Sequence, residues 1–557
     1  MDMERVKEIG GDLLDTTVIY LEKARVEVNS RCARYEAWQI ILVAVGITLL
    51  ISRFLKWLDH PRLTKKQRVV QSFWRFLKGL PIIKGKVKEE VAKNVKKIGE
   101  EMYPNKEGDR FLTELPADGI SQKEILSRLE SYEATSIADW KNGRVSGCVY
   151  GGTEELSSLC SEVYHRFAWT NPLHPDVFPG VRRMEAEVVA MCLKLYNAGP
   201  EAGGTMTSGG TESILLAVQT FRDIAFERGI ERPEIVVPST AHAAFDKAGH
   251  YFGLRVIKVP NDPKTHTVDV KAMRGKITKN TCLLVASAPS FPYGLIDNVE
   301  EVSKLGERYN IHVHVDACLG GFLLPFMEKA GFPLPLFDFR LPGVSSISVD
   351  THKYGYAPKG SSVIMYKDKE IRNFQFFVAP NWSGGIYATP TMAGSRPGAL
   401  IAGCWATLMK FGENGYVKET KRIIEETRYI TEKLKKIDGI FVFGTPLLSV
   451  VAVGSHKFDT FRVFVALGKK GWNLNSLQFP ASFHLCVTQR HTREVSNALI
   501  KDVRECVKEV MKDPGKKAEG AAALYGTAQS IPDRSIITDM ARGYLAACYN
   551  TAMGDQN

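Results

Sequence analysis

The sequence predicts an α/β protein built on a mostly parallel sheet, with one membrane-spanning helix before it and a smaller α+β domain after it. Residues 202–366 alternate short apolar runs with helical stretches, which is typical of parallel strands joined by crossover helices. Residues 37–52 carry no charge, and after about residue 410 the pattern changes to long helices and short strands. With 557 residues, 44% of them hydrophobic, the chain has room for roughly two to four folding units.

The uncharged stretch predicts a single-pass membrane anchor. Its 16 residues are fewer than the ~20 that usually span a bilayer, but apolar residues continue to Leu58. Aromatic residues suited to the membrane interface lie at both ends: Tyr35, Trp38 and Trp57. A cleavable signal peptide does not fit, because 36 mostly polar residues precede the stretch. A buried core helix is the alternative.

The positive charge of the chain is concentrated next to this stretch. There are 73 Lys and Arg against 62 Asp and Glu, and residues 53–100 alone hold fourteen basic and four acidic residues. A nucleic-acid-binding protein needs a basic face on its folded body, so we expect no nucleic-acid partner. The positive-inside rule places the body in the cytosol and residues 1–36 in the lumen. A short span suits the thin membrane of the endoplasmic reticulum.

These patterns predict six segments. They are a luminal segment over 1–36, the transmembrane helix over 37–58, a basic stalk over 59–110, the first part of the body over 111–200, the sheet domain over 201–410 and the small domain over 411–557. Ser121 and Glu124 have the spacing of a capping box and predict the start of a helix. The ten cysteines show no CxxC pair, which indicates reduced thiols in a cytosolic body.

The predicted strands of the large sheet are apolar runs, and polar residues follow three of them. The runs are Glu234–Pro238, Cys282–Ser287, Ile311–Asp316, Ser346–Asp350 and Ser362–Tyr366, and Ser213–Arg228 has helical periodicity. His242, Asp316 and Lys353 come at strand ends, where parallel sheets collect their chemistry. In the small domain the sequence predicts a helix over Asn414–Ile437 and strands over Phe441–Phe443, Ser449–Val453 and His484–Val487.

The run Thr205–Ser213 (TMTSGGTES) opens the predicted helix. Its glycines permit close backbone approach, Ser208 and Thr211 offer hydroxyl groups, and the first turn of the helix leaves N–H groups free. These features suit a phosphate, although no GK[ST] follows as in a Walker loop. An ordinary glycine-rich helix start is the alternative.

Lys353 lies just after a strand in Val349–Ser362 (VDTHKYGYAPKGSS), beside His352. Burial next to a second potential cation lowers a lysine pKa, so we expect a lysine suited to forming a bond with a carbonyl carbon. A solvated surface lysine is the alternative.

His312, His314 and Asp316 lie on one face of a strand, which raises the question of a metal site. The following residues 317–321 add no ligand, so we expect no metal. Asp316 can instead face a pyridinium nitrogen. His242 has small neighbours that leave room for a flat ring, although a structural histidine explains it equally well.

A phosphate cradle, a ring-stacking histidine, an aspartate and a lysine in this order are what a pyridoxal-phosphate site needs. From about residue 110 to 550 the chain resembles the fold-type-I pyridoxal-phosphate enzymes of the group II decarboxylase-like family. Within that family its longer motifs resemble the sphingosine-1-phosphate lyases: NPLHPD at 171–176, HVDACLGGF at 314–322, VDTHKYGYAPKGSS at 349–362 and GGIYATPTMAGSRPG at 384–398.

The resemblance implies a role for each matching residue. Lys353 would bind pyridoxal 5'-phosphate covalently, His242 would stack on its ring and Asp316 would pair with its pyridine nitrogen. The cofactor phosphate would be bound by Gly210, Thr211 and His352, next to Ser208, with Gly394 and Ser395 reaching in from the partner subunit. Residues lining the substrate phosphate and the reacting centre would be Tyr150, His174, Lys359 and Tyr387.

The resemblance also implies a membrane-bound homodimer that cleaves a phosphorylated long-chain base to a long-chain aldehyde and phosphoethanolamine. An amino-acid decarboxylase, which uses the same cofactor constellation, is the alternative within the family. An inactive membrane scaffold is a third reading, and the intact set of Lys353, Asp316 and His242 counts against it.

Overall fold

The computed structural model describes residues 19–58, 65–81, 111–518 and 534–551, apart from positions 21, 32 and 137, and a few positions between 84 and 96. The chain divides into two compact units, Met1–Leu80 and Pro81–Asn557. Much of the predicted stalk, and the first residues of the predicted luminal segment, lie outside the described residues.

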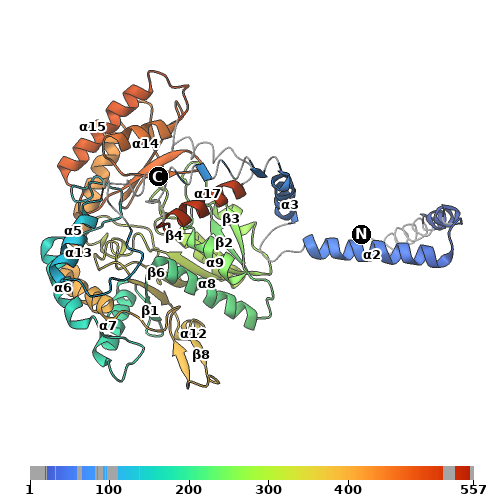
Figure 1. Cartoon of the computed structure of the whole chain (residues 1–557), viewed down its shortest axis with the longest axis horizontal. Coiled ribbons are helices and arrows are strands. Elements are labelled where there is room, and N and C mark those ends of the chain that lie inside the picture. The colour runs from blue at the N-terminus through green and yellow to red at the C-terminus, as the bar shows by residue number, and fades with distance from the viewer. Residues whose placement is uncertain are drawn as a thin grey trace, which may run out of the picture. The chain divides into compact units, whose positions relative to one another are not determined.

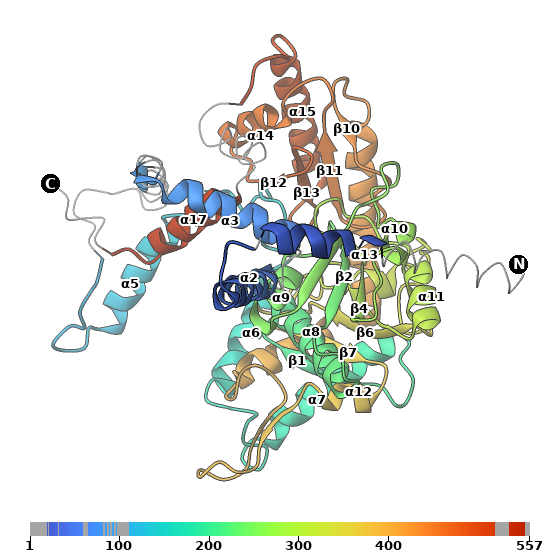
Figure 2. The same ribbon diagram turned by 90° about the vertical axis from the view of Figure 1, so that its right-hand side faces the viewer.

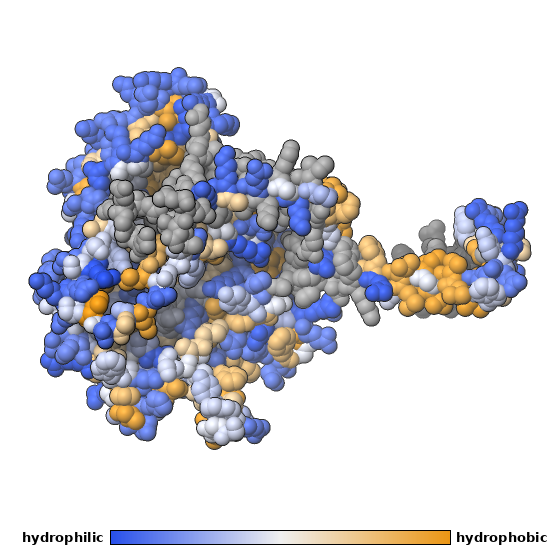
Figure 3. Space-filling view, viewed as in Figure 1, coloured by the Kyte–Doolittle hydropathy of each residue, from blue (hydrophilic) through white to orange (hydrophobic). Residues whose placement is uncertain are grey.

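The first unit contains helices α2 (Ala37–Leu58) and α3 (Lys65–Gly79). Among the described residues α2 is the one helix long and apolar enough to cross a membrane, over Ala37–Leu55. Its apolar side chains face outward along its length (Figure 3). The helix occupies the range predicted for the span, and it is compatible with a single-pass anchor.

The second unit is built on a seven-stranded sheet in the order β1-β7-β6-β5-β4-β2-β3 (Figure 1). The strands are β1 (Gly203–Thr207), β2 (Glu234–Pro238), β3 (Arg255–Val259), β4 (Thr281–Ser287), β5 (His312–Asp316), β6 (Val344–Val349) and β7 (Ser362–Tyr366). All neighbours pair in parallel except β7, which is antiparallel to both β1 and β6. The predicted mostly parallel sheet is confirmed.

Two layers of helices cover the sheet, one on each face. Both faces need cover because successive side chains of a buried strand point to opposite faces, and both sets are apolar. Ile235 and Val237 of β2 pack with α8 (Gly210–Glu227) and α9 (Ala244–Phe252), which Figure 2 shows close together. Val236 of the same strand belongs to the larger core on the opposite face. That core includes the remaining long helices around the sheet: α7 (Pro179–Leu195), α11 (Val299–Tyr309) and α13 (Gly398–Leu434).

A second sheet lies further along the chain. It has the antiparallel order β10-β11-β13-β12, formed by β10 (Phe441–Val442), β11 (Val450–Gly454), β12 (Asn475–Leu477) and β13 (Ser482–Cys486). Helices α14 (Thr460–Lys469) and α15 (Arg493–Val510) pack with it. The strands predicted for this region correspond to β10, β11 and β13. The boundary at residue 411 stays a prediction, since α13 runs through it with a kink at Gly412.

The remaining elements are short or peripheral. They are α5 (Gln122–Glu133), α6 (Glu154–Phe167), α10 (Val270–Arg274), the 3-10 turn η1 (Leu324–Phe326), α12 (Lys369–Asn373), the pair β8 (Phe377–Ala379) and β9 (Tyr387–Thr389), and α17 (Arg534–Ala547). The hydroxyl of Ser121 accepts from Glu124 N at the start of α5, as predicted. The Glu124 carboxylate, however, pairs with Arg128.

Candidate active site

The predicted site residues gather at the carboxyl end of the parallel strands. Asp316 is the last residue of β5, His242 follows the end of β2, and Lys353 follows the end of β6. Strands that run in parallel present these ends at one edge of the sheet. The sheet therefore explains why residues more than a hundred positions apart in the sequence share one site.

Lys353 forms a buried ion pair with Asp350. The distance from Lys353 Nζ to Asp350 Oδ2 is 2.8 Å, and the two side chains are 23% and 2% exposed. The other carboxylate oxygen of Asp350, Oδ1, is buried and has no hydrogen-bond partner. A buried oxygen without a partner is costly, so the carboxylate has capacity for one more donor.

The expected lowering of the Lys353 pKa is wrong. Burial does lower the pKa, but the negative charge of Asp350 outweighs it, so the pKa of Lys353 is raised. Its sequence neighbour His352 adds no repulsion, because burial lowers the His352 pKa and keeps that ring neutral. The lysine is therefore held as an ammonium group.

The ring of His352 is held near the same ion pair by hydrogen bonds from the backbone of its own turn. Its Nδ1 accepts from Ser361 N at 3.0 Å and Gly360 N at 3.3 Å. This network assigns the ring hydrogen to Nε2, which lies 3.7 Å from Asp350 Oδ2. An N–H on that side suits an anion that approaches the turn.

Gly210, the first residue of α8, lies directly against the ion pair. A Cβ at this position would lie 2.8 Å from Asp350 Oδ1 and 2.8 Å from Cys318 Sγ, so only glycine fits without displacing a buried group. No side chain caps this helix, whose N-cap is Gly209. The first-turn N–H groups and the positive end of the helix dipole are thus available to an anion.

A cavity of 580 Å³ adjoins the start of α8. Its polar lining includes Ser208, Thr211, Gly360 and Ser395 from separate parts of the chain. Glu212 joins two of these parts, since its carboxylate accepts from Ser208 N at 2.6 Å and from Met392 N at 3.0 Å. Ser395 thus lies near Ser208 and Thr211 of its own chain. That Ser395 reaches the cofactor phosphate of a partner subunit stays a prediction.

Two contacts hold the loop that carries Ser395. Asn171 Nδ2 donates to Ser395 Oγ at 3.0 Å, while Asn171 Oδ1 accepts from Arg396 N at 3.2 Å. Arg396 also forms a buried bidentate pair with Glu185 of α7, with Nη2 to Oε2 at 3.0 Å. Gly394 lies under the hydroxyl of Tyr387, which leaves no room for a Cβ.

Asp316 and His242 are positioned by their own backbone. Asp316 is 6% exposed, and its Oδ1 accepts from Cys318 N at 3.1 Å. His242 Nδ1 accepts from Ala244 N at 3.1 Å, and its ring is exposed. The exposed ring leaves a face on which a flat ligand can stack.

Tyr150 and Lys359 form a second cationic site, close to the Lys353–Asp350 ion pair. Lys359 Nζ lies 4.7 Å from the centre of the Tyr150 ring and donates to His352 O at 3.3 Å. Partial burial, followed by repulsion from Lys353, lowers the Lys359 pKa. Burial raises the pKa of Tyr150, so its hydroxyl stays protonated and can donate.

His174 lies apart from this pair. Its backbone N donates to Asn171 O at 3.1 Å, which places it on the loop tied to Ser395. Within the described chain, no hydrogen bond, ion pair or ring contact joins His174 to Tyr150 or Lys359. That His174 lines the substrate phosphate together with Tyr150 and Lys359 therefore stays a prediction.

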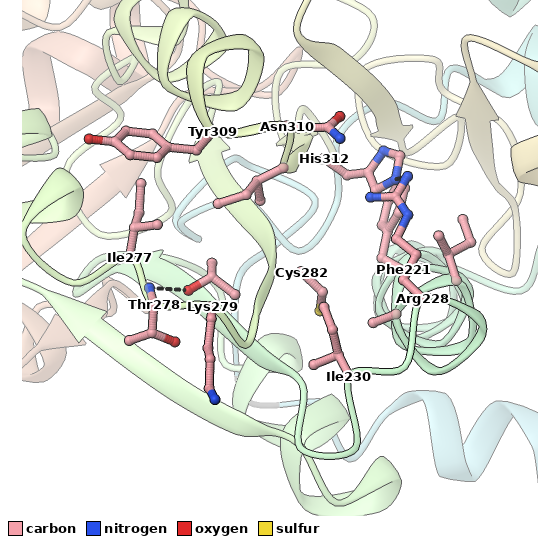
Figure 4. Close-up of a pocket in the computed structure, with 14 residues that line it drawn as sticks. Phe221, Arg228, Ile230, Ile277, Thr278, Lys279, Cys282, Tyr309, Asn310 and His312 are labelled. Atoms are coloured by element: carbon pink, nitrogen blue, oxygen red, sulfur yellow. Dashed lines mark hydrogen bonds between the residues drawn. The ribbon is translucent and has the colours of Figure 1, made fainter.

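The side chains of the predicted HxHxD strand, His312, His314 and Asp316, do not converge on one binding site. His314 is buried between the hydroxyls of Ser346 and Ser348, at 2.8 and 3.1 Å from its two ring nitrogens. His312 lies in a separate cavity of 410 Å³ at the other end of β5, with its Nε2 3.2 Å from Arg228 Nη2 (Figure 4). No cluster of three metal-ligating side chains occurs among the residues that the structure describes.

Sequence reasoning missed several residues that build the site: Asp350, Cys318, Asn171, Glu185, Glu212 and Arg396. Asp350 carried a local signal, because an acidic residue three positions before a lysine, in the turn after a strand, can fold back on it. Cys318 and Glu212 contact the nearby Asp316 and Ser208. Asn171, Glu185 and Arg396 act through contacts with residues far away in the sequence, for which no local pattern exists.

The residues present fit pyridoxal phosphate. The uncapped start of α8 and the hydroxyls of Ser208 and Thr211 suit its phosphate, and Asp316 suits a pyridinium nitrogen. Lys353 suits its aldehyde carbon, and His242 is an exposed residue whose ring suits stacking. The unpartnered Asp350 Oδ1 shows that the centre has hydrogen-bonding capacity to spare.

Comparison with known proteins agrees with this fit. Residues 104–453 match the family model described as the pyridoxal-dependent decarboxylase conserved domain. The chain is 48% identical to "Sphingosine-1-phosphate lyase 1" of Rattus norvegicus over 97% of this chain and 94% of that protein. It is 42% identical to the sphingosine-1-phosphate lyase of Saccharomyces cerevisiae over 98% and 95%.

Solved structures agree. A sphingosine-1-phosphate lyase from Burkholderia pseudomallei, 38% identical, covers 77% of this chain and 98% of its own, with a TM-score of 0.72. A glutamate decarboxylase from Lactobacillus brevis, 20% identical over 74% and 98%, has a TM-score of 0.63 and shares the fold. The chain therefore belongs to the pyridoxal-dependent decarboxylase family and, within it, to the sphingosine-1-phosphate lyases.

Proposed function

We propose that this chain is a pyridoxal-phosphate-dependent lyase that cleaves phosphorylated long-chain bases such as sphingosine 1-phosphate to a long-chain aldehyde and phosphoethanolamine. The observation that best supports the proposal is the second cationic site, in which Lys359 lies over the Tyr150 ring, close to the Lys353–Asp350 pair. The anion-binding site at the start of α8 suits the cofactor phosphate. The site formed by Lys359 and Tyr150 suits a phosphate on the substrate.

The chain's own residues position the reaction. When bound, pyridoxal phosphate supplies an electron sink for the negative charge that develops at C2 of the substrate as the C2–C3 bond breaks. Lys353 would hold the cofactor. Asp316 would keep a proton on the pyridine nitrogen, and the His242 ring would stack on the cofactor.

The second cationic site, formed by Lys359 and Tyr150, holds the substrate. Lys359 and the protonated hydroxyl of Tyr150 bind its phosphate, which fixes C2 near Lys353 Nζ. His174 and Tyr387 would add further contacts to the substrate. A base must remove the proton of the C3 hydroxyl so that the aldehyde can leave.

We also infer that α2 anchors the enzyme in the endoplasmic reticulum membrane, with residues 1–36 in the lumen and the catalytic body in the cytosol. The apolar span and the fourteen basic residues that follow it over 53–100 support this orientation. An anchor places the site beside a substrate whose alkyl chain lies in the bilayer. A homodimer, with Gly394 and Ser395 reaching the partner's cofactor, completes the proposal.

The test is to give the purified, cofactor-loaded protein sphingosine 1-phosphate and, in parallel reactions, glutamate and aromatic amino acids. We expect aldehyde and phosphoethanolamine from the first and no carbon dioxide from the others. The Lys353→Ala protein is the control, and it should lose both turnover and the visible absorbance of bound cofactor. Carbon dioxide release without aldehyde would establish the decarboxylase alternative.

A further inference from the structure

We propose that α3 is an amphipathic helix that lies in the surface of an anionic membrane, with its apolar face among the acyl chains and its basic residues at the lipid headgroups. The proposal rests on the membrane anchor proposed for α2, and it assigns to α3 a second membrane contact of a different kind. It replaces a simple solvated stalk over this part of the chain.

The sequence of α3 separates apolar from polar residues around the helix. At roughly 100° per residue the apolar positions of this sequence fall on one half of the helical circumference, and most of the polar and basic positions fall on the other. The apolar half consists of Val69, Val70, Phe73, Trp74, Phe76 and Leu77. The opposite half consists of Gln67, Arg68, Gln71, Ser72, Arg75 and Lys78. Lys65 lies at the boundary, and Lys66 is an exception at the first turn.

Most of the apolar half is exposed in the described part of the structure, whereas Trp74 and Leu77 are partly buried. Val69 and Val70 are 49% and 44% exposed, and Phe73 and Phe76 are 56% and 69% exposed. A helix of a globular protein turns such a half toward a core. An exposed aromatic and aliphatic face of this kind needs an apolar partner.

Charge and position identify that partner as a lipid surface. The 15 residues of α3 include five Lys or Arg and no Asp or Glu, which matches the anionic headgroups of a cytosolic leaflet. Only six residues separate the end of α2 at Leu58 from Lys65, and a chain of that length reaches no further than about 20 Å. At about 22 Å in length, with five charges, α3 is unsuited to span the bilayer itself.

The contact has a consequence for substrate supply. A helix seated about 5–10 Å into the interface tethers the chain to the membrane at a second point beyond α2. The proposed substrate carries its phosphate at the same level of the same leaflet. Turnover of substrate within vesicles should therefore depend on anionic lipid, whereas turnover of detergent-dispersed substrate should not.

The experiment compares the full-length protein in vesicles of neutral phosphatidylcholine and in vesicles containing about one-third phosphatidylserine. Amide hydrogen exchange over residues 65–79 is the readout. We expect exchange to be at least about tenfold slower in the anionic vesicles, because seating in the interface removes water from the helix. Phe73→Glu/Phe76→Glu should abolish this protection.

The matched control is Gln67→Glu/Gln71→Glu, which adds the same two negative charges to the polar half. It should retain most of the protection, because its apolar face is intact. Equal loss in both variants, or equal protection in both lipids, would overturn the proposal; the latter would mean that α3 packs against protein.

Two further measurements separate this proposal from those on which it depends. Retention of all variants in membranes after a carbonate wash tests α2 alone. Aldehyde formation from detergent-dispersed substrate tests the activity, and we expect both variants to match the wild type. If the protection is lost while the anchor and activity persist, only the apolar face of α3 accounts for it.

Discussion

At the scale of single residues, the charge of Lys353 depends on a neighbour in space rather than on its neighbour in sequence. His352 is adjacent in the chain but neutral, whereas Asp350 folds back to 2.8 Å from Nζ. The groups around the lysine also include Asp316, Cys318 and Lys359. Because the folded-state pKa of Lys353 is raised, the pair stabilises the fold below about pH 10.5 and loses that effect only as pH rises further.

Asp350→Asn should make Lys353 more reactive in the cofactor-free protein. Without the carboxylate, burial and the charge of Lys359 lower the lysine pKa, so more of it is unprotonated at a given pH. The pH of half-maximal labelling by an amine reagent, followed on the Lys353 peptide by mass spectrometry, should fall by about 1–3 units. The control is Asp438→Asn, whose partner is the exposed Lys457. An unchanged labelling profile would contradict the role of Asp350.

Asp316→Asn should retain the cofactor and lose most of the activity. The amide cannot hold a proton on the pyridine nitrogen, whereas Lys353 and the start of α8 still bind the rest of the molecule. We expect bound cofactor to be equal to wild type by absorbance and turnover to fall by at least roughly 100-fold. Normal turnover in this variant would mean that Asp316 has another role.

At the scale of elements, the sequence predicted the buried parallel strands best. β2 and β7 match their predicted ranges, and β4, β5 and β6 agree within two residues at each end, because strands buried on both faces form continuous apolar runs. Of the strands in the two larger sheets, β1, β3 and β12 escaped prediction and lack such a run, and the short pair β8 and β9 was not predicted either. β1 (GGTMT) contains two glycines, and β3 and β12 lie at sheet edges and are only partly buried.

Gly210→Ala tests the close approach of α8 to the ion pair. The added methyl group would lie within 3 Å of Asp350 and Cys318, so it should displace the buried carboxylate. We expect a loss of about 1–3 kcal/mol in stability and at least about tenfold weaker cofactor binding, measured by thermal unfolding and by absorbance titration. Gly468→Ala in α14 is the matched control, since nothing lies within 4 Å of that position.

The buried histidine of β5 predicts acid sensitivity of the fold. Burial lowers the pKa of His314 to about 4, whereas in the unfolded chain it is about 6.5. Below pH 6.5 the unfolded state gains a proton that the folded state does not, so stability falls as pH drops toward 4, by up to roughly 3 kcal/mol. His314→Asn should shallow this decline in unfolding experiments across that range. His165→Gln, at an exposed position, should leave the decline unchanged.

At the scale of the whole molecule, the sequence predicted which residues share the site but not the contacts that hold them together. Lys353, Asp316 and His242 could be placed at one sheet edge from strand ends alone. The grouping of Tyr150 with Lys359, and of His174 with the Ser395 loop, depends on how distant segments pack. No local pattern encodes such packing, because each partner is chosen by the tertiary fold.

Deleting residues 1–58 should leave a soluble, active dimer. These residues lie within a separate compact unit that ends at Leu80, and they include the one described helix suited to a bilayer. Removing them takes away the apolar span but none of the predicted site residues. Sedimentation should give about twice the chain mass, with aldehyde formation from detergent-dispersed substrate retained. An aggregated or inactive product would show that the first unit is needed for folding.

The contacts that hold the Ser395 loop also set the order in which the site can form during synthesis. Asn171 and Ser395 are 224 residues apart, Glu185 and Arg396 are 211 apart, and Glu212 and Met392 are 180 apart. The start of α8 leaves the ribosome long before the loop that closes over it, and closing such long loops is slow. The cofactor site can therefore be completed only late in synthesis, after the segment that carries the Ser395 loop has left the ribosome.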